Sequence, residues 1–409
     1  MSPLKQQPVY FEIFWTFFQL GCYSFGGPSA HLVFFHQRFV QQLKWLDDPH
    51  YAQYLALAQL LPGPTSSQVG IAIGYSKGGY WGACCAWLGF TLPSAVLMTA
   101  AAVFGLHYVD QISAQVFHIL HLIVLAVVFW AFWQMMRSFC QQTWQYVVML
   151  AATVFLYLSP LPAAHIILIL SAGIVGLVLG RMGWIKPSSQ PIMTSSQPVR
   201  TAKTKKTTAI WLLFFILPFI LFPTLYFLNQ DYAWHILFSL YETASLVFGG
   251  GHIILPLMYQ DFVLTEMLTK EQFDLGYSLT QLMPGPLFSF ASYVGALLPI
   301  TPFVSLNALI ATIIIFLPSF FLMFAALPYW SIWIHQPRVA QMVSSINAAV
   351  VGLLLCLIID VTQTAIKQFQ DVIFVGMVIL LLRSRLPIWC TLVGSFFAYY
   401  AVIHYLSLT

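Results

Sequence analysis

The chain carries one helix-breaking sequence twice. Residues 59–68 read Gln59-Leu60-Leu61-Pro62-Gly63-Pro64-Thr65-Ser66-Ser67-Gln68, and residues 281–289 read Gln281-Leu282-Met283-Pro284-Gly285-Pro286-Leu287-Phe288-Ser289. Proline disfavours helix in the residue before it, glycine permits a sharp turn, and a second proline suits the first turn of a new helix. Both copies lie in apolar sequence, where a broken helix is tolerated only against protein or a water-filled cavity. The sequence therefore predicts two broken helices inside a membrane protein.

Composition supports this class. Of the 409 residues, 60% are hydrophobic and only 7% are charged, whereas soluble domains carry roughly a quarter charged residues. The apolar runs are continuous, which excludes the alternating pattern of an outer-membrane barrel. We predict an all-α polytopic membrane protein surrounded by lipid. The net charge of +4 gives no reason to expect a nucleic-acid partner, and the six cysteines show no CxxC spacing, so no metal or cofactor is expected.

The apolar segments fall into two length classes. Short arms at 9–25, 29–42, 51–61 and 65–77 cannot cross a hydrocarbon core of about 30 Å as single straight helices, so re-entrant hairpins are expected. Full spans are predicted at residues 79–105, 113–136, 143–159, 162–180, 209–228, 302–329, 339–363, 370–383 and 387–406.

Three landmarks recur in order along the chain. Phe25-Gly26-Gly27-Pro28 matches Phe248-Gly249-Gly250-Gly251-His252, the Pro-Gly-Pro breaks match each other, and Phe90-Thr91-Leu92-Pro93-Ser94 matches Phe316-Leu317-Pro318-Ser319, at offsets of 223, 222 and 225 residues. An internal duplication follows. We divide the chain into an N-terminal transporter repeat (1–180), a basic linker (181–208), a connecting transmembrane helix (209–229) and a C-terminal repeat (230–409).

The basic residues predict the topology. If the linker and the N-terminus are cytoplasmic and the short arms return to the side they entered, 14 of the 16 Lys and Arg residues lie inside, as the positive-inside rule requires. The halves then have opposite orientations in the cytoplasmic (inner) membrane. This is an inverted repeat, and its hairpins are expected to meet near the midplane.

The breaks are the candidate binding site. Helices that open after Pro64 and Pro286 would direct free N–H groups and the positive ends of their dipoles at one place, which favours an anion. Kinks that serve packing alone are the alternative. His31, His252 and Glu242 are candidates for proton coupling. His118 and His121 have a metal-like spacing without further ligands, so an interfacial position is expected for them. The candidate substrate-binding residues are Phe25, Gly26, Gly27, Pro28, His31, Gln59, Pro62, Gly63, Pro64, Thr65, Ser66, Ser67, Gln68, Phe248, Gly249, Gly250, Gly251, His252, Gln281, Pro284, Gly285, Pro286 and Ser289.

These motifs, together with Trp45-Leu46-Asp47 and Trp87-Leu88-Gly89, resemble the chromate ion transporter family in its full-length, two-domain form. The resemblance covers nearly the whole chain except the linker. It implies an inner-membrane secondary transporter that exports chromate and confers chromate resistance, with sulfate as competitor. The Phe-Gly-Gly and Pro-Gly-Pro residues are the ones carried over. Thr65, where a small residue such as alanine is expected, and Pro49-His50 depart from the pattern.

Other functions remain open at this point. A sulfate or oxyanion importer and a channel-like anion pathway are alternatives, and a membrane-embedded enzyme is a remote one. The chain has no P-loop and no convincing nucleophile–base pair, so an enzyme is not expected. Direction, coupling ion and oligomeric state are not fixed by the sequence, and a homodimer is one of the open assemblies.

Overall fold

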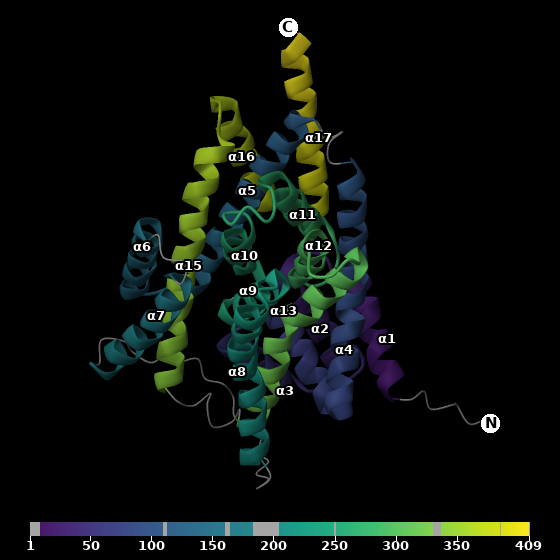
Figure 1. The fold of residues 1–409 in the computed structure, drawn as a ribbon, viewed down its shortest axis with the longest axis vertical. Helices are drawn as coiled ribbons and strands as arrows, with labels where there is room; N and C mark the ends of the chain where they lie inside the picture. Colours follow the sequence, from purple (N-terminus) through teal and green to yellow (C-terminus); the bar gives the residue numbers. More distant parts are fainter. Residues whose placement is uncertain are drawn as a thin grey trace, which may run out of the picture. The chain divides into compact units, whose positions relative to one another are not determined.

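The computed structural model describes residues 9–108, 113–159, 164–182, 204–248, 251–329, 337–384 and 386–408. This part of the chain is almost entirely helical and contains no strand (Figure 1). Six helices are long and apolar enough to cross a membrane, which confirms the prediction of an all-α polytopic membrane protein. They are α4 (Thr65–Tyr108), α5 (Ala114–Phe139), α7 (Ala164–Arg181), α8 (Thr204–Asn229), α13 (Val304–Ala326) and α15 (Pro337–Ala365).

The other helices are shorter. They are α1 (Val9–Tyr23), α2 (Gly27–Phe35), α3 (Asp48–Leu60), α6 (Thr143–Leu158), α9 (Tyr232–Leu246), α10 (Ile254–Phe262), α11 (Lys270–Leu282), α12 (Phe290–Leu297), α16 (Phe369–Leu382) and α17 (Ile388–Leu408). A π-helix (His36–Gln42) continues α2, and 3-10 turns occupy Gly251–Ile253, Leu287–Ser289 and Leu327–Tyr329. Asp47 caps α3 by accepting the backbone N–H of His50 at 2.9 Å. The same N–H and the His50 side chain lower the pKa of the exposed Asp47 carboxyl.

The long helix α4 is bent back on itself. Gly79 has φ +62°, and neither it nor Gly78 has helical backbone angles. A side-chain carbon on Gly74 would overlap the carbonyl oxygen of Gly82, and one on Gly82 would overlap that of Gly74. In a straight helix these residues would stand about 12 Å apart along the axis. The two arms of α4 therefore pack against each other, and the turn lies at the predicted boundary between 77 and 79.

The chain forms two compact units. The first comprises residues 1–99, 188–251 and 283–337, and the second comprises residues 100–187, 252–282 and 338–409. Each unit contains segments from both sequence repeats. The units therefore do not coincide with the halves that the landmarks define, and both repeats can supply side chains to one site.

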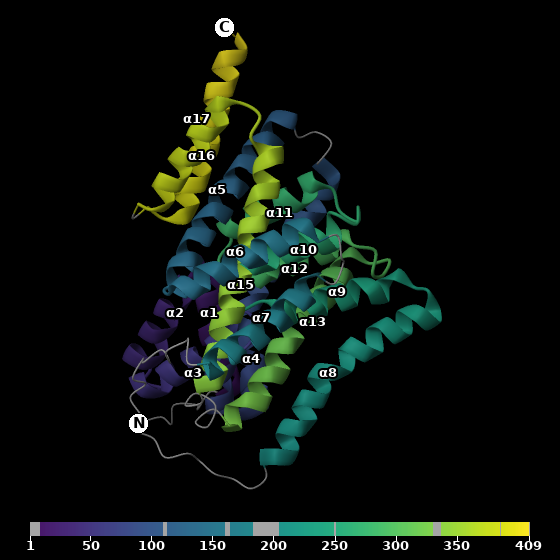
Figure 2. The same cartoon turned by 90° about the vertical axis from the view of Figure 1, so that its left-hand side faces the viewer.

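In the first unit, α8 lies beside α9 and α13, and α12 packs on α13 (Figure 2). Phe17, Phe35, Phe39 and Phe90 form an aromatic core between α1, α2 and α4, with ring centroids 4.7–5.8 Å apart. The sequence predicted a span over about residues 209–228; the helix α8 contains it and begins earlier, at Thr204, inside the predicted linker. The Thr208 hydroxyl donates to the Ala325 carbonyl at 3.1 Å, which ties this first turn to α13. Linker residues 183–203 lie outside the described residues.

In the second unit, α11, α16 and α17 pack on α5. His118 and His121, one turn apart on α5, each pair with a carboxylate of another helix. His118 Nε2 lies 3.0 Å from Asp371 Oδ1, and His121 Nε2 contacts Asp274 Oδ2. Within the described residues, no group of three or more side chains could hold a metal ion. The two histidines therefore join helices to one another.

These pairs predict unequal losses of stability. Asp274 is 5% exposed, and His121→Leu leaves its carboxylate buried without that partner. We expect a loss of about 3–5 kcal/mol, measured by thermal unfolding in detergent. His118→Leu is the matched control and should cost clearly less. Its partner Asp371 keeps the Tyr399 hydroxyl at 2.6 Å and the N–H groups of Lys367 and Gln368. Equal losses would contradict this account.

Candidate functional site

The first break is a short extended segment between α3 and α4. Leu61 is extended, Gly63 has φ +128°, and α4 begins at Thr65. The Gly63 N–H donates to the carbonyl of Val247 at 2.6 Å, and the Gln68 side-chain amide donates to the Pro62 carbonyl at 2.6 Å. Residues 63–70 are buried throughout. The N-terminus of α4 therefore lies inside the protein, directly after the break.

The second break has similar backbone angles but a different continuation. Gly285 has φ +94°, and its N–H donates to the carbonyl of Ser24 at 3.0 Å. The sequence predicted a helix directly after Pro286, but a 3-10 turn, Leu287–Ser289, precedes α12. The Ser289 hydroxyl donates back to the Pro286 carbonyl at 2.7 Å. This turn uses the hydroxyl that the sequence offered as a ligand.

Each break is capped by the opposite repeat. Ser24 lies two residues before Gly26-Gly27, and Val247 lies two residues before Gly249-Gly250; we call these glycine pairs the Gly-Gly tips. The two capping hydrogen bonds are therefore equivalent under the repeat. The serines of the two Leu-Pro-Ser landmarks, Ser94 and Ser319, likewise each lie against the break of the other repeat. A side-chain carbon on Gly63 would overlap Ser319 Oγ, and one on Gly285 would lie 2.8 Å from Ser94 Oγ. Only glycine fits at these two points.

His31 links the first Gly-Gly tip to the start of α4. It is fully buried, with Nε2 at 3.1 Å from the Ser24 carbonyl and Nδ1 at 3.4 Å from Ser66 Oγ. A carbonyl can only accept, so Nε2 carries the hydrogen, and in the neutral ring Nδ1 accepts from the Ser66 hydroxyl. His31 thereby fixes the orientation of Ser66, and Ser24 receives hydrogen bonds from both His31 and Gly285.

A set of buried polar atoms in the first unit has no hydrogen-bond partner in the described part of the chain. Ser319 is close to Gln68 across Gly63, and the Trp87 ring packs at 5.6 Å on Phe316 and Phe320, which flank Ser319 on α13. Buried polar groups are nearly always paired, so an unpaired group suggests a missing ligand. The unpaired atoms are Ser24 Oγ, Ser67 Oγ, Gln68 Oε1, Trp87 Nε1, Thr91 Oγ1 and Ser319 Oγ.

Most of these atoms can donate a hydrogen bond. Four hydroxyls (Ser24, Ser67, Thr91 and Ser319) and the Trp87 indole N–H belong to the set. The free N–H groups in the first turn of α4 and the positive end of its dipole also favour a negatively charged ligand. A donor-rich, buried helix N-terminus is suited to an oxyanion.

The two breaks differ in polarity. Thr65-Ser66-Ser67-Gln68 occupies the first, whereas the equivalent second segment is Leu287-Phe288-Ser289-Phe290. Phe288 and Phe290 are fully buried. The Ser94 hydroxyl, beside the second break, donates to the Thr91 carbonyl at 3.0 Å, whereas Ser319 Oγ beside the first is unpaired. The first break is therefore the more polar of the two, and it is the candidate site.

The remaining predicted residues have varied positions. The side chains of Phe25 and Gln59 are exposed, and those of Phe248 and Glu242 are partly exposed. Gly26 and Gly27 have positive φ angles, +102° and +76°, directly before Pro28 at the start of α2. Gln281 is the next-to-last residue of α11, in the second unit. Gly251 lies close to Pro28 and Leu287, which brings the two tips together. Gly249, Gly250 and the side chain of His252 lie outside the described residues.

Sequence reasoning missed Trp87, Thr91 and Ser319 as site residues. The signal was present, because Thr91 belongs to one Leu-Pro-Ser landmark and Ser319 to its copy. These landmarks were used only to align the repeats. A duplicated serine that follows a proline inside two apolar spans could have been added to the site.

A many-spanning helical protein with a buried polar helix break has the architecture of a membrane transporter. The chain belongs to the chromate transporter family, whose sequence profile matches residues 11–177 and again residues 234–400. The two matches are offset by 223 residues (234 − 11), within the range of the landmark offsets. The resemblance predicted from the motifs is thus confirmed, and the duplication covers most of the chain.

Curated relatives extend over most of the chain. A chromate transport protein of Pseudomonas aeruginosa is 25% identical over 372 residues, which cover 90% of this chain and 84% of the relative. One of Cupriavidus metallidurans is 25% identical over 374 residues, covering 90% and 86%. An uncharacterised transporter of Methanocaldococcus jannaschii is 22% identical over 383 residues, covering 93% and 91%. No solved structure matches the chain.

The close approach at Gly63 can be tested by comparing two glycines. Gly63→Ala meets both a positive φ and the Ser319 hydroxyl, whereas Gly79→Ala meets a positive φ with open space around it. The backbone cost alone is about 1–2 kcal/mol. We therefore expect Gly79→Ala to fold with a small fall in melting temperature and Gly63→Ala to lose much more. Adding Ser319→Gly should recover part of the Gly63→Ala loss. No recovery would show that the Ser319 contact does not limit this position.

Proposed function

We propose that this protein is a secondary transporter that exports chromate from the cytoplasm, and that the first break in the first unit is its binding site. The buried hydroxyls of Ser67 and Ser319, which lie at the N-terminus of α4 and have no partner among the described residues, are the observation that carries the proposal. Family membership and the names of the relatives support chromate as the substrate. The first unit is built from both repeats, so both contribute to this site.

Neutral donors suit a transporter of a dianion. Ser67, Ser319 and Trp87, with the N–H groups of α4, can donate to several oxygens of a tetrahedral ion at once. Hydrogen bonds to a charged group contribute about 1.5–3 kcal/mol each. Residues 59–70 contain no Lys or Arg, so the ion would be held without a fixed countercharge. Transport needs binding strong enough for entry and weak enough for release.

The membrane potential can drive export. Moving one elementary charge down a potential of 100 mV releases about 2.3 kcal/mol of free energy. A dianion that leaves a negative cytoplasm therefore releases roughly 4–5 kcal/mol. The sequence has no P-loop for ATP. We place the protein in the inner membrane with its N-terminus and linker in the cytoplasm, because 14 of 16 basic residues then lie inside.

We further propose that the two repeats have opposite orientations. The equivalent capping bonds, Gly63 to Val247 and Gly285 to Ser24, support this arrangement, since each repeat closes the break of the other. Alternating access would then expose the first break to each side of the membrane in turn. Both ring nitrogens of His31 are already engaged. Glu242 and His252 are therefore the groups we retain for coupling to protons.

Removing the unpaired hydroxyls should weaken chromate transport. We expect Ser67→Ala and Ser319→Ala each to raise the KM for chromate uptake into inverted membrane vesicles by about tenfold or more, the equivalent of one hydrogen bond to a charged group. Ser289→Ala is the matched control. Ser289 is the repeat equivalent of Ser67, but its hydroxyl is bonded to Pro286. Sulfate is added as competitor, because it is also a tetrahedral dianion.

The outcomes separate the alternatives. Saturable chromate uptake that Ser67→Ala weakens and Ser289→Ala does not would support the site. Equal effects of the two variants would place the substrate elsewhere, and flux that does not saturate would favour a channel-like pathway. If correctly folded protein transports sulfate but not chromate, the assignment of chromate as the substrate is wrong.

Export driven by the potential predicts a dependence on voltage. In inverted vesicles with a positive interior, chromate should accumulate, and at 100 mV the dianion gradient can approach about a thousandfold. Collapsing the potential with potassium and valinomycin should abolish accumulation while leaving equilibration. Accumulation that persists without the potential, but disappears with the pH gradient, would instead establish proton coupling as the driving force.

A further inference from the structure

The second unit holds two helices that are fixed to a third. Residues of α6 contact α15 directly. A side-chain carbon on Gly352 of α15 would overlap the carbonyl oxygen of Met149, and the Thr153 hydroxyl donates to the Gly352 carbonyl at 2.9 Å. The Gln145 side-chain amide donates to Ser344 Oγ at 2.7 Å. These bonds hold α6 against α15 along about two turns of the helix.

The other helix, α7, is fixed to α15 just as closely. A side-chain carbon on Gly176 would lie 2.6 Å from the carbonyl oxygen of Gln341 and 2.8 Å from the Cβ of Ser345. Glycine is required there because the two backbones nearly touch. Since α6 and α7 are each held on α15, they cannot move together to fill a space between them.

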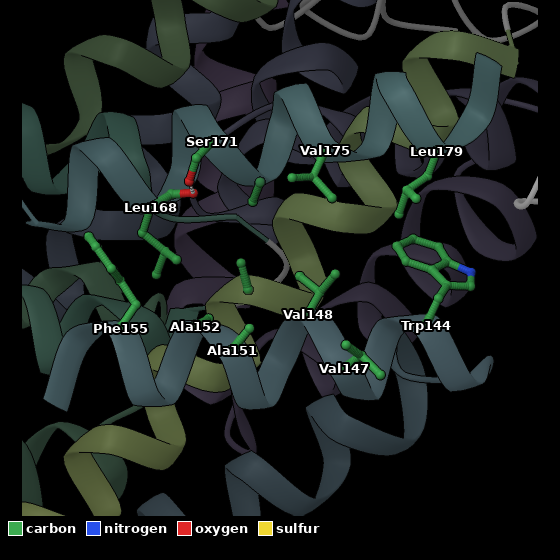
Figure 3. A pocket seen from close by; sticks show the side chains of 12 residues that line it. Trp144, Val147, Val148, Ala151, Ala152, Phe155, Leu168, Ser171, Val175 and Leu179 are labelled. Atoms are coloured by element: carbon green, nitrogen blue, oxygen red, sulfur yellow. Dashed lines mark hydrogen bonds between the residues drawn. The ribbon is translucent and has the colours of Figure 1, made fainter. Parts of the chain in front are cut away.

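Such a space exists. A cavity of about 550 Å³ lies between α6 and α7, with Ala349 of α15 also lining it. Figure 3 shows the side chains of both helices pointing into it, with Trp144 and Leu179 at one end and Phe155 and Leu168 at the other. The volume is within the range of sites for small ligands.

The lining offers nothing to a polar ligand. Its hydroxyl, on Ser171, donates to the Leu168 carbonyl at 3.0 Å, and the Trp144 indole N–H donates to Gln142 Oε1 at 2.7 Å. The other lining residues are Ala, Val, Leu and Phe. A water needs two to four polar partners, so water is disfavoured here and a hydrocarbon is favoured.

The length of the cavity matches one leaflet. Trp144 and Phe155 are eleven residues apart on α6, which corresponds to about 16 Å. Half of a hydrocarbon core of about 30 Å is about 15 Å. One acyl chain of a lipid in a single leaflet would therefore occupy the cavity from end to end.

One end of the cavity carries positive charge. Arg181 is exposed in the last turn of α7, two residues after Leu179. Trp144 at the same end is a residue type that anchors at the membrane–water interface. Basic residues at this level attract anionic lipid headgroups. We propose that the α6–α7 cavity binds one acyl chain of an anionic phospholipid, with the headgroup at the Arg181 end.

Native mass spectrometry of the full-length protein in mild detergent tests this proposal. Phosphatidylglycerol and phosphatidylethanolamine with identical acyl chains are added in turn, and bound lipid is counted. We expect the wild type to retain one phosphatidylglycerol. Ala151→Phe, which fills the cavity from an exposed position of α6, should abolish retention. The matched control Leu150→Phe, on another face of α6, should leave it unchanged.

A second variant tests the headgroup without filling the cavity. Arg181→Gln should reduce the preference for phosphatidylglycerol over phosphatidylethanolamine about fivefold, the effect of one basic residue near the membrane surface, while a lipid is still retained. Absence of lipid from the wild type, or equal retention in Ala151→Phe and Leu150→Phe, would overturn the proposal. A wild-type dimer without lipid that Ala151→Phe dissociates would show that a second copy covers this cavity.

Discussion

The first unit depends on two backbone hydrogen bonds that close its helix breaks. An unpaired N–H in a membrane interior costs several kcal/mol, because no water is present to replace the lost partner. Gly63 and Gly285, at the centres of the breaks, each donate to a carbonyl that lies two residues before a Gly-Gly tip of the other repeat. In both breaks the carbonyl that accepts this bond comes from the other repeat. The compact unit therefore contains both.

The same bonds connect the tips to the polar site. The Ser24 carbonyl accepts from Gly285 and from His31, and His31 in turn holds the Ser66 hydroxyl at the start of α4. A displacement of the first tip would strain both bonds to Ser24 together. The start of α4 would then lose the partner that orients Ser66. The site and the second break are thus joined through one carbonyl oxygen and one imidazole ring.

The features that depend on local sequence were predictable. Pro-Gly-Pro dictates a break wherever it stands, and the apolar runs placed the spans to within a few residues. The helix α8 begins at Thr204, a few residues before the predicted span at about 209–228, and its Thr208 bonds to Ala325 of a distant helix, a contact that local sequence does not reveal. Ser67, Gln68 and His31 could be named as candidates for the proposed site because they lie beside the breaks in the sequence. Ser319 and Trp87 were missed because their contribution arises from packing between repeats, and the carboxylate partners of His118 and His121 were missed for the same reason.

The difference between the two breaks follows from the cost of unpaired donors. A buried donor without a partner costs about 1–3 kcal/mol until a ligand binds. If the first break binds a dianion, as we propose, a second polar break would carry that cost without a compensating ligand. At the second break, Phe288 and Phe290 replace Ser66 and Gln68, and Ser94 and Ser289 bond to carbonyls of their own segments. Apolar burial there stabilises the scaffold. The two copies of the duplicated sequence therefore differ: hydroxyls within the second break bond to the protein itself, whereas Ser67 and Ser319 at the first have no partner among the described residues, which is the difference that the proposed anion site requires.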